Sequence, residues 1–323
     1  MKASIQAKYG SPDVLTVQDV EKPTPADDEV LVRIHATTVN RTDWGILCGK
    51  PFLMRLFFGL SKPRMRISGT DFAGTVEAVG KNVKSFTAGD RIMGFSGLGL
   101  RSHAEYLAVR ETRLVTTIPD NITFRQAAAS LEGAIYALSS MIRKVDPKAG
   151  QKALVIGATG AIGSAAVQFL KERGVEVTAT CTTTNLELVK SLGAARAIDY
   201  SMDDFTKDDQ QYHFVLDTVG KSSFGECKPL LLHGGTYISA DAGPNGENVY
   251  LPLVTAMIGD KKVMAPIPRD VRNSLSLIKD SIARGAFKPV IDRGYQLENI
   301  AEAFEYVASG QKIGNVLITL VAD

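Results

Sequence analysis

The sequence predicts an α/β protein with a doubly wound parallel sheet, preceded by a smaller lobe rich in β-strands. Residues 153–174 carry the main signal: a short apolar run leads into three glycines at every third position and then a helical apolar period. From about residue 123 strand-like and helix-like runs alternate, whereas the first 122 residues show short strand-like runs separated by turn residues. At 323 residues the chain is too long for one typical core, so two domains are expected.

The first predicted domain comprises residues 1–122 and is completed by residues 268–323. Residues 29–36 alternate in side-chain character after a proline-rich turn, and residues 74–80 and 86–94 form further strand-like runs. Several such runs at short spacing favour a barrel-like lobe. This lobe contains no phosphate-binding glycine pattern.

The second predicted domain comprises residues 123–267. A helix is predicted over residues 126–144, followed by the strand 153–156, the glycine turn and a helix that ends near Gly174. Strand-like runs at residues 175–180, 197–200, 214–217 and 236–239 alternate with helical patterns such as residues 185–192. Beyond this domain, apolar faces predict helices around residues 275–282 and 300–307, and residues 315–320 form a closing strand.

The glycine turn contains Gly157, Gly160 and Gly163, and it reads GxxGxxG, or AxGxxG from Ala158. Because glycine has no Cβ, backbone amides at the start of the next helix can approach a pyrophosphate, and the helix dipole favours its negative charge. In this strand–turn–helix setting the pattern predicts dinucleotide binding. The alternative is a glycine-rich turn that only packs the helix on the sheet.

The end of the second strand indicates which dinucleotide is bound, because this end meets the adenosine ribose. Residues 180–185 read TCTTTN and contain no acid that would accept from both ribose hydroxyls. The hydroxyls of Thr182 and Thr183 can instead donate to a 2′-phosphate, and Tyr200 or Lys312 can reach it from elsewhere. NADP is therefore favoured over NAD, with a polar turn and helix N-cap as the alternative.

The composition argues against several classes of protein. The formal net charge is +2 and no dense run of Lys or Arg occurs, so nucleic acid is not an expected partner. The three cysteines lie far apart, which argues against a disulfide framework or a structural zinc site. The N-terminus lacks the apolar core of a secretion signal, so a cytoplasmic protein acting on a small molecule is expected.

The most apolar stretch covers residues 51–60 and is about half as long as a bilayer span requires. It is interpreted as a loop or short helix that lines an apolar cleft, and no membrane is expected as a partner. The alternative is a membrane-surface or partner-binding face made by Phe52, Leu53, Leu56, Phe57 and Phe58.

Seven stretches in order along the chain resemble the medium-chain dehydrogenase/reductase superfamily, and within it the zinc-free quinone oxidoreductase-like branch. They are VNRTDW (residues 39–44), GTDFAGTVEAVGKNVKSFTAGDRIMG (69–94), SHAEY (102–106), GATGAIGSAAVQ (157–168), SLGAARAIDY (191–200), FVLDTVG (214–220) and KIGNVLI (312–318). The resemblance implies a GroES-like first lobe, a Rossmann second lobe and nicotinamide bound in the cleft between them. It also implies a homodimer or tetramer joined through Rossmann-sheet edges, for which residues 249–264 are a candidate.

The resemblance also bears on the chemistry. Zinc-dependent members place Cys where this chain has Asn40 and His-Glu where it has Thr70-Asp71, so no metal is expected and hydride transfer would proceed without a Lewis acid. Quinones and α,β-unsaturated carbonyls suit such a transfer, because their charge spreads over a π system. The expected activity is therefore NADPH-dependent, zinc-independent reduction of such acceptors.

The candidate site residues fall into two groups. The proposed catalytic residues are Asn40, Asp43, Trp44 and Tyr136; their structural alternatives are a turn-forming Asn, a buried cap, a core aromatic and a core tyrosine. Glu132, where many relatives have an apolar residue or proline, is interpreted as a helix-dipole partner, and none of the four histidines is assigned catalysis. The predicted cofactor-binding residues are Gly157, Ala158, Thr159, Gly160, Ala161, Ile162, Gly163, Thr182, Thr183, Tyr200, Val219, Lys312 and Asn315.

Two other functions remain open at this point. One is a zinc-independent alcohol dehydrogenase or ketone reductase, which would use the same cofactor on a simple carbonyl. The other is an NADPH-binding protein with a regulatory rather than a catalytic role, although the near-neutral charge offers no basic surface for nucleic acid.

Overall fold

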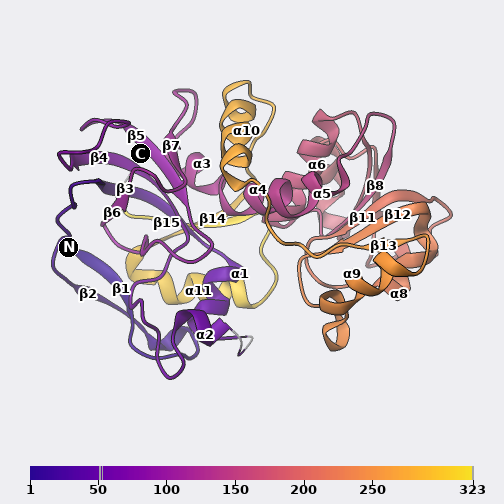
Figure 1. The fold of residues 1–323 in the computed structure, drawn as a ribbon, viewed down its shortest axis with the longest axis horizontal. Helices are drawn as coiled ribbons and strands as arrows, with labels where there is room; N and C mark the ends of the chain where they lie inside the picture. Colours follow the sequence, from indigo (N-terminus) through magenta and orange to yellow (C-terminus); the bar gives the residue numbers. More distant parts are fainter. Residues whose placement is uncertain (51, 53, 322–323) are drawn as a thin grey trace. The chain divides into compact units, whose positions relative to one another are not determined.

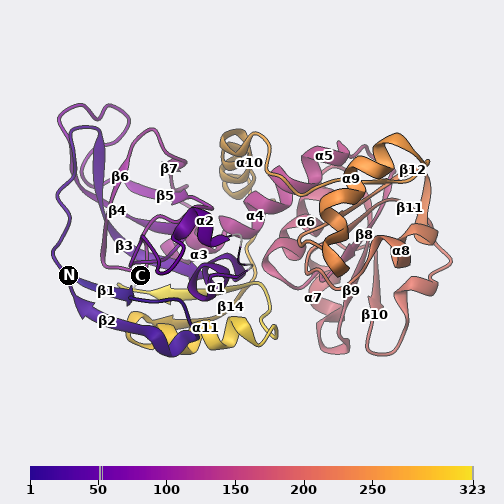
Figure 2. The same cartoon turned by 60° about the horizontal axis from the view of Figure 1, so that its bottom comes forward.

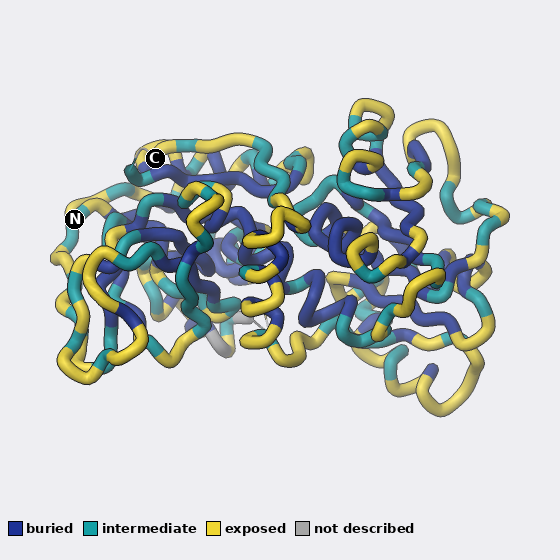
Figure 3. Tube along the Cα trace, turned by 90° about the horizontal axis from the view of Figure 1, so that it is seen from above, coloured by how far each residue is buried: buried dark blue, intermediate teal, exposed yellow. Residues whose placement is uncertain are grey.

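The computed structural model describes residues 1–50, 52 and 54–321, and the chain forms two compact units. The first unit contains Met1–Glu132, Leu275–Ala283 and Lys288–Asp323, and the second contains Gly133–Ser274 and Arg284–Phe287. Figure 3 shows that buried segments form the interior of each unit while turns and loops are exposed. The domain limits at residues 122 and 267 remain predictions.

The first unit is built mainly from antiparallel strands, as its short strand-like runs predict (Figure 1). A seven-stranded sheet has the order β14-β15-β3-β4-β5-β7, with β6 paired to β3 off this path, and β1 pairs with β2 separately. The strands are β1 (Lys2–Gln6), β2 (Leu15–Asp19), β3 (Glu29–Val39), β4 (Asp71–Val79), β5 (Arg91–Phe95), β6 (Tyr106–Arg110), β7 (Val115–Thr117), β14 (Ile291–Gln296) and β15 (Asn315–Thr319).

Helices of the first unit cover this sheet and carry its core. The helix α11 (Ile300–Ala308) buries the predicted face of Ile300, Ala303, Phe304 and Val307 against β3, β15 and α1 (Arg41–Cys48). Such an apolar stripe contributes roughly 25 cal/mol for each Å² removed from water. The other helices are α2 (Met54–Phe58), α3 (Phe124–Ala129) and the part of α10 (Val271–Ala283) from Leu275 onward, with 3₁₀ turns at Pro12–Val14 and Leu297–Asn299.

The second unit contains a six-stranded, wholly parallel sheet in the order β10-β9-β8-β11-β12-β13. This is the Rossmann order, in which the chain reverses direction across the sheet between the first and fourth strands. Ligands of such sheets bind outside the carboxyl ends of the strands at this switch point, here β8 and β11. The strands are β8 (Lys152–Ile156), β9 (Glu176–Cys181), β10 (Arg196–Asp199), β11 (Tyr212–Asp217), β12 (Leu231–Ser239) and β13 (Lys262–Val263).

Helices lie on both faces of the parallel sheet. In Figure 1, α6 lies above the strands and α8 and α9 lie below them, and Figure 2 shows the strands in sheet order. The helices are α4 (Glu132–Tyr136), α5 (Arg143–Val145), α6 (Ala161–Glu172), α7 (Leu186–Ser191), α8 (Phe224–Cys227) and α9 (Glu247–Met257). A π-helical segment covers Ala137–Ile142, and 3₁₀ turns cover Thr183–Asn185, Phe205–Lys207, Lys228–Leu230 and Pro244–Gly246.

Two predicted elements differ from the structure. The helix predicted over residues 126–144 is interrupted at Ser130 and Leu131, because the Ser130 hydroxyl donates to the Gln126 carbonyl (2.7 Å) and the chain tightens there to i→i+3 bonds. Residues 249–264 supply a sheet edge only at β13, since α9 occupies most of the stretch. A short apolar run does not distinguish a strand from a helix by its period.

Candidate functional site

The glycine turn between β8 and α6 has the geometry that a bound pyrophosphate requires. Gly157 has φ +76°, which glycine adopts without strain, and Gly160 is the N-cap of α6. A Cβ on Gly160 would have only one contact, 3.5 Å from the Gly157 carbonyl oxygen, so this side of the turn is open. A Cβ on Gly163 would lie 2.2 Å from the same oxygen, so the third glycine lets α6 pack closely on the strand end.

The turn is held by the neighbouring strands. The Gly157 amide donates to the Thr180 hydroxyl (3.2 Å), and the Ala158 amide donates to the Thr180 carbonyl (3.2 Å). The first amides of a helix have no acceptor within the helix, so those of Ala161, Ile162 and Gly163 are available at this end. These residues fit a dinucleotide pyrophosphate, with the helix dipole adding to the attraction.

The threonines after β9 lie beside a carboxylate that the linear pattern did not indicate. Asp199 ends β10 and pairs in register with Cys181, and its carboxylate accepts hydrogen bonds from the hydroxyls of Thr183 and Ser201. These hydrogen bonds lower the pKa of Asp199, Ser201 contributing most. The Thr182 hydroxyl accepts from Asn185 Nδ2 (2.8 Å), and Tyr200 is 53% exposed with its amide bonded to the Cys181 carbonyl.

A loop after β11 completes this edge of the second unit. Asp217 is fully buried, and its carboxylate accepts from the amides of Val219 (3.1 Å), Gly220 (2.8 Å) and Ser222 (2.9 Å). The Thr218 hydroxyl donates to the carbonyls of Ile156 (2.8 Å) and Gly157 (3.2 Å). The loop therefore joins the ends of β8 and β11, and it presents the 44%-exposed Val219 beside the glycine turn.

The predicted catalytic residues of α1 lie within a buried polar network of the first unit. Asn40 is the N-cap of α1 and is 2% exposed, and its side-chain nitrogen contacts the Thr38 hydroxyl and Asp71 Oδ2 (3.4 Å). Asp43 is fully buried; its Oδ2 accepts from the Asn40 amide (2.9 Å), while its Oδ1 has no hydrogen-bond partner among the described residues. Trp44 packs on the core cluster with the Arg41 guanidinium 4.9 Å from its ring centroid.

Asp71 lies at the centre of this network. Its carboxylate accepts from the Thr38 amide (2.9 Å), the Thr38 hydroxyl (2.5 Å) and the Thr37 hydroxyl (3.2 Å). The pKa of Asp71 is nevertheless raised to about 7, because burial and, to a smaller extent, the charge of Glu132 outweigh these hydrogen bonds. The nearby His103 is also fully buried, which lowers its pKa to about 4, and its ring nitrogens contact Ser68 Oγ and the Thr38 carbonyl.

Glu132 joins two further threonines to the network. Its Oε1 accepts from the Thr42 hydroxyl (2.7 Å) and its Oε2 accepts from the Thr70 hydroxyl (2.8 Å), although the residue is only 6% exposed. Burial raises the pKa of Glu132, and the hydrogen bonds from Thr42 and Thr70 oppose the shift. The interpretation of Glu132 as a helix-dipole partner does not include these two hydrogen bonds. Their donors, Thr42 and Thr70, lie 90 and 62 residues before Glu132 in the chain.

Replacing Asp71 with Asn tests this buried carboxyl. Because the folded pKa is about 7 and the ordinary value is 3.8, the folded state retains a proton that the unfolded chain releases between these values. Stability from Asp71 is therefore full at low pH and is lost by about 1.4 kcal/mol per pH unit as pH rises to about 7. In urea denaturation, the free energy of unfolding of Asp71→Asn relative to the wild type should therefore rise with that slope from pH 5 to 7. Above pH 7 the difference should stay constant. The exposed variant Asp120→Asn is the control, and a pH-independent difference for Asp71→Asn would contradict the expectation.

The remaining predicted residues are placed as follows. Lys312 donates through Nζ to the Gly314 carbonyl (2.5 Å); burial lowers its pKa to about 8, while the charge of Glu132 raises it. Asn315 is 3% exposed and its side chain donates to the Val290 carbonyl (3.0 Å). Tyr136 is half-buried in the second unit, at the end of α4 and directly before the π-helical segment. The network thus brings Asn40, Asp43 and Lys312 together within the first unit, through Asp71 and Glu132.

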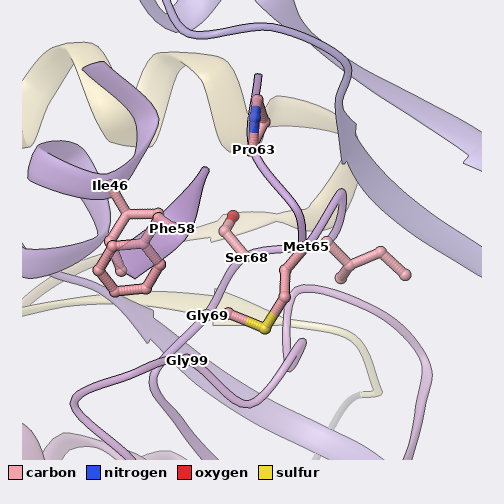
Figure 4. A pocket seen from close by; sticks show the side chains of 8 residues that line it. Ile46, Phe58, Pro63, Met65, Ser68, Gly69 and Gly99 are labelled. Carbon is pink, nitrogen blue, oxygen red and sulfur yellow. The ribbon is translucent and has the colours of Figure 1, made fainter. Parts of the chain in front are cut away.

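A small apolar pocket lies in the first unit beside α2. Its volume is about 10 Å³, and Figure 4 shows the ring of Phe58 and the thioether of Met65 among the groups around it. The complete lining is Ile46, Phe58, Pro63, Met65, Ile67, Ser68, Gly69 and Gly99. Phe58 thus lines a pocket, while Phe52 and Leu56 are exposed. Pro51, Leu53 and the side chain of Phe57 lie outside what the structure describes.

No group of three or more His, Cys, Asp or Glu side chains in residues 1–50, 52 and 54–321 is arranged to hold a metal ion. Within the same residues, every helix is too short or too polar to cross a bilayer.

The antiparallel first unit and the parallel sheet with its glycine turn define a two-domain dehydrogenase fold. Family models agree: residues 26–120 match the alcohol dehydrogenase GroES-like domain and residues 192–318 match the zinc-binding dehydrogenase domain. The chain is 32% identical over 314 residues to the chloroplast envelope quinone oxidoreductase homolog of Arabidopsis thaliana, covering 93% of this chain and 92% of that protein. It is 30% identical to the NADPH-dependent alkenal/one oxidoreductase of the same plant, covering 98% and 79%.

A solved structure extends the agreement in fold. The Escherichia coli quinone oxidoreductase complexed with NADPH superposes with a TM-score of 0.83 at 24% identity, over 99% of this chain and 100% of that one. The chain belongs to the medium-chain dehydrogenase/reductase superfamily, in its quinone oxidoreductase-like branch. The predicted fold, a GroES-like lobe with a Rossmann lobe, is confirmed.

Proposed function

We propose that this protein is an NADPH-dependent, zinc-independent oxidoreductase that reduces quinones or α,β-unsaturated carbonyls. The observation that carries the proposal is the open glycine turn at the switch point of the parallel sheet, in a chain of this family. When bound, the cofactor supplies a hydride. Gly157, Gly160 and Gly163 would hold its pyrophosphate, and Val219 would flank it.

The names of two relatives support the choice of substrate class and cofactor. One relative at 32% identity is named a quinone oxidoreductase homolog, and another at 30% identity is named an NADPH-dependent alkenal/one oxidoreductase. In this chain the ribose end carries the hydroxyl group of Thr182, which accepts from Asn185 and can donate its own hydrogen to a 2′-phosphate, whereas Thr183 donates its hydrogen to Asp199. The carboxylate of Asp199 accepts from Thr183 and Ser201, and it ends β10 rather than β9, the strand at whose end an NAD-specific acid would stand.

The donor set of the first unit supports zinc independence. Where zinc-dependent members of the superfamily have Cys and His-Glu, this chain has an amide, a hydroxyl and a carboxyl, at Asn40, Thr70 and Asp71. Zinc in proteins prefers thiolate and imidazole ligands. In addition, the side chains of all three residues are engaged in hydrogen bonds with Thr38 or Glu132.

A steady-state panel tests the function. Purified protein is assayed with a quinone, an enone and a simple ketone, each with NADPH and with NADH, before and after treatment with a zinc chelator. We expect NADPH oxidation with the quinone or the enone and no effect of the chelator. Turnover of the ketone alone would support a ketone reductase instead, and NADPH binding without turnover of any acceptor would support a regulatory role.

The cofactor choice has its own test at the end of β9. Thr182→Asp places a carboxylate near the expected 2′-phosphate, so NADPH affinity should fall at least about tenfold, or about 1.4 kcal/mol, while NADH affinity changes little. Calorimetric titration with both nucleotides measures this. Ser191→Asp adds the same charge at the exposed end of α7 and serves as the control. Equal losses for the two nucleotides would argue against a 2′-phosphate site here.

A homodimer in the cytoplasm is also part of the proposal. The helix α9 and the residue after it expose large apolar side chains: Val249 (72%), Leu253 (73%), Met257 (86%) and Ile258 (70%). A contiguous apolar surface of this kind is typical of an association site, and α9 packs beside the edge strand β13. Sedimentation velocity should give a dimer for the wild type and a monomer for Leu253→Asp; two identical profiles would place the interface elsewhere.

A further inference from the structure

Glu132 occupies a position that the fold alone does not explain. It begins the five-residue helix α4, yet its carboxyl group is buried and each oxygen accepts from a different threonine hydroxyl. Burying a carboxylate costs several kcal/mol unless hydrogen bonds or opposite charge compensate. An amide or an apolar side chain would begin the helix equally well, so the carboxyl group points to a chemical role.

The two threonines differ in exposure, so the chain of hydrogen bonds has one buried end and one end that is partly open to solvent. Thr70 is fully buried, whereas Thr42 is only half-buried on the first turn of α1. A hydroxyl group can donate one hydrogen bond and accept two, and its hydrogen rotates to suit its partners. When Glu132 is ionised, the Thr42 hydroxyl donates to it. When Glu132 is protonated, it can donate to Thr42 and leave the Thr42 hydrogen free to point outward.

We propose that Glu132 supplies the proton that completes reduction, and that it acts through the Thr42 hydroxyl rather than by touching the substrate. This inference rests on the proposed function, since only a reduction that leaves a carbanion, enolate or quinol oxygen needs such a proton. The geometry that carries it is the chain of two short contacts from the buried Thr70 through Glu132 to the half-exposed Thr42.

The charged groups around Glu132 determine how many protons its buried network holds. Asp43 of α1 and Asp71 of β4 interact electrostatically with Glu132, and burial raises the pKa of each. Three carboxyl groups in one buried network cannot all ionise without mutual repulsion, so the network retains protons at neutral pH. Lys312 opposes this by lowering the pKa of Glu132, and Lys312 is itself influenced by Asp292 and Arg41.

The proton transfer accompanies the hydride that NADPH supplies when it is bound, which leaves NADP⁺. The hydride adds to the β-carbon of the enone as a C–H bond, and the displaced π electrons move onto the enolate. The α-carbon of the enolate then takes the hydrogen of the Thr42 hydroxyl, while Thr42 takes the carboxyl hydrogen of Glu132. Glu132 is left as a carboxylate, and water returns its proton before the next turnover. For a quinone the acceptor of this proton is the oxygen that gains charge.

The kinetic test compares Glu132→Gln with the wild type across pH, using an acceptor that the wild type turns over. Wild-type kcat should fall as pH rises through the pKa of Glu132, because the protonated acid is required. Glu132→Gln should lose about 100-fold in kcat and should lose that pH dependence, with NADPH affinity unchanged. Glu132→Asp should recover part of the rate. Glu302→Gln, an exposed carboxylate of α11 in the same unit, is the control.

Thr42 gives the second pair of variants. Thr42→Val keeps the shape of the side chain but removes the hydroxyl, so it should reproduce the loss of kcat, and Thr42→Ser should restore it. Wild-type rates in Thr42→Val, or an unchanged pH profile in Glu132→Gln, would overturn the proposal. Equal thermal stability of Glu132→Gln and the wild type would separate a chemical role from a merely structural one.

An infrared titration tests the proton without any turnover. A carboxylic acid C=O band should be present in the wild type near neutral pH and reduced in Glu132→Gln, with Asp43 and Asp71 supplying the remainder. Identical bands in the two proteins would contradict the inference. If the band is reduced but no acceptor is turned over, the proposed function fails while the protonated Glu132 stands; if turnover occurs and the bands are identical, only the role of Glu132 fails.

Discussion

Gly163→Val should destabilise the second unit by about 3 kcal/mol and weaken dinucleotide binding on the order of 100-fold. A Cβ at this position would lie 2.2 Å from the Gly157 carbonyl oxygen and 2.8 Å from the Ala158 Cα atom. Neither backbone atom can move without displacing the turn or lifting α6 from β8, and overpacking of this kind typically costs 1–3 kcal/mol. The amides at the start of α6 would then no longer converge on the pyrophosphate, and two factors of ten in affinity correspond to about 2.8 kcal/mol.

The measurements are urea denaturation for stability and calorimetry for NADPH affinity. Gly225→Ala in α8 is the matched control, because a Cβ there would have only one contact, 3.8 Å from Ser223 Oγ. Gly160→Ala separates the two effects: it should fold normally, since its Cβ has an ordinary contact, and still weaken binding by crowding the open side of the turn. Wild-type affinity in Gly163→Val would mean that the turn is not the dinucleotide site.

Asp217→Ala should lower the free energy of unfolding of the second unit by about 3 kcal/mol, because it leaves four donors without an acceptor, two of which, the amide and the hydroxyl of Ser222, are buried. The amides of Val219, Gly220 and Ser222 all donate to this carboxylate, and the Ser222 hydroxyl does so at 2.8 Å. Each buried donor left unsatisfied costs roughly 1–3 kcal/mol, part of which water entry would recover. The loop would loosen beside the glycine turn, so NADPH affinity should also fall by about tenfold.

Asp209→Ala, an exposed aspartate of the same unit, gives the baseline for removing a carboxylate. Asp217→Asn refines the result, since its single carbonyl oxygen can accept from only part of the set that two carboxylate oxygens serve. An Asp217→Ala protein as stable as the wild type would show that the loop satisfies its amides in another way. Hydrogen exchange at Val219 and Gly220 reports directly on this loop.

Local sequence was sufficient for the glycine turn and for the elements that flank it. Ala153 to Ile156 lie within β8, and Gly174 has the expected positive φ of 72°. Of the predicted helix face, Ala166, Phe169 and Leu170 are buried and Ile162 is half-buried. Each of these features depends on neighbours within a few residues along the chain, where apolar period and glycine content are direct signals. The interruption at Ser130 could not be predicted in this way, because a side-chain bond to the preceding turn competes with the helical pattern.

The polar contacts of the site required the folded chain. Asp199 reaches Thr183, just after β9, because β10 pairs with β9 in a parallel register that sets Asp199 beside Cys181, 18 residues earlier in the chain. Glu132 meets Thr42 and Thr70 because the first residue of α4, the first turn of α1 and the residue before β4 lie together in the first unit. The one available signal was that a charged residue stood where relatives have an apolar residue or proline. The sequence did not indicate that Thr42 and Thr70 bind Glu132.

The sequence by itself determined the order of the elements, the position of the glycine turn and the family, because periodicity, glycine spacing and motif order are all properties of residues near one another along the chain. Only the tertiary structure decided which polar groups share a buried site and how their pKa values shift. Burial and the distance between charges depend on residues that the chain brings together from remote positions, and no local pattern records them.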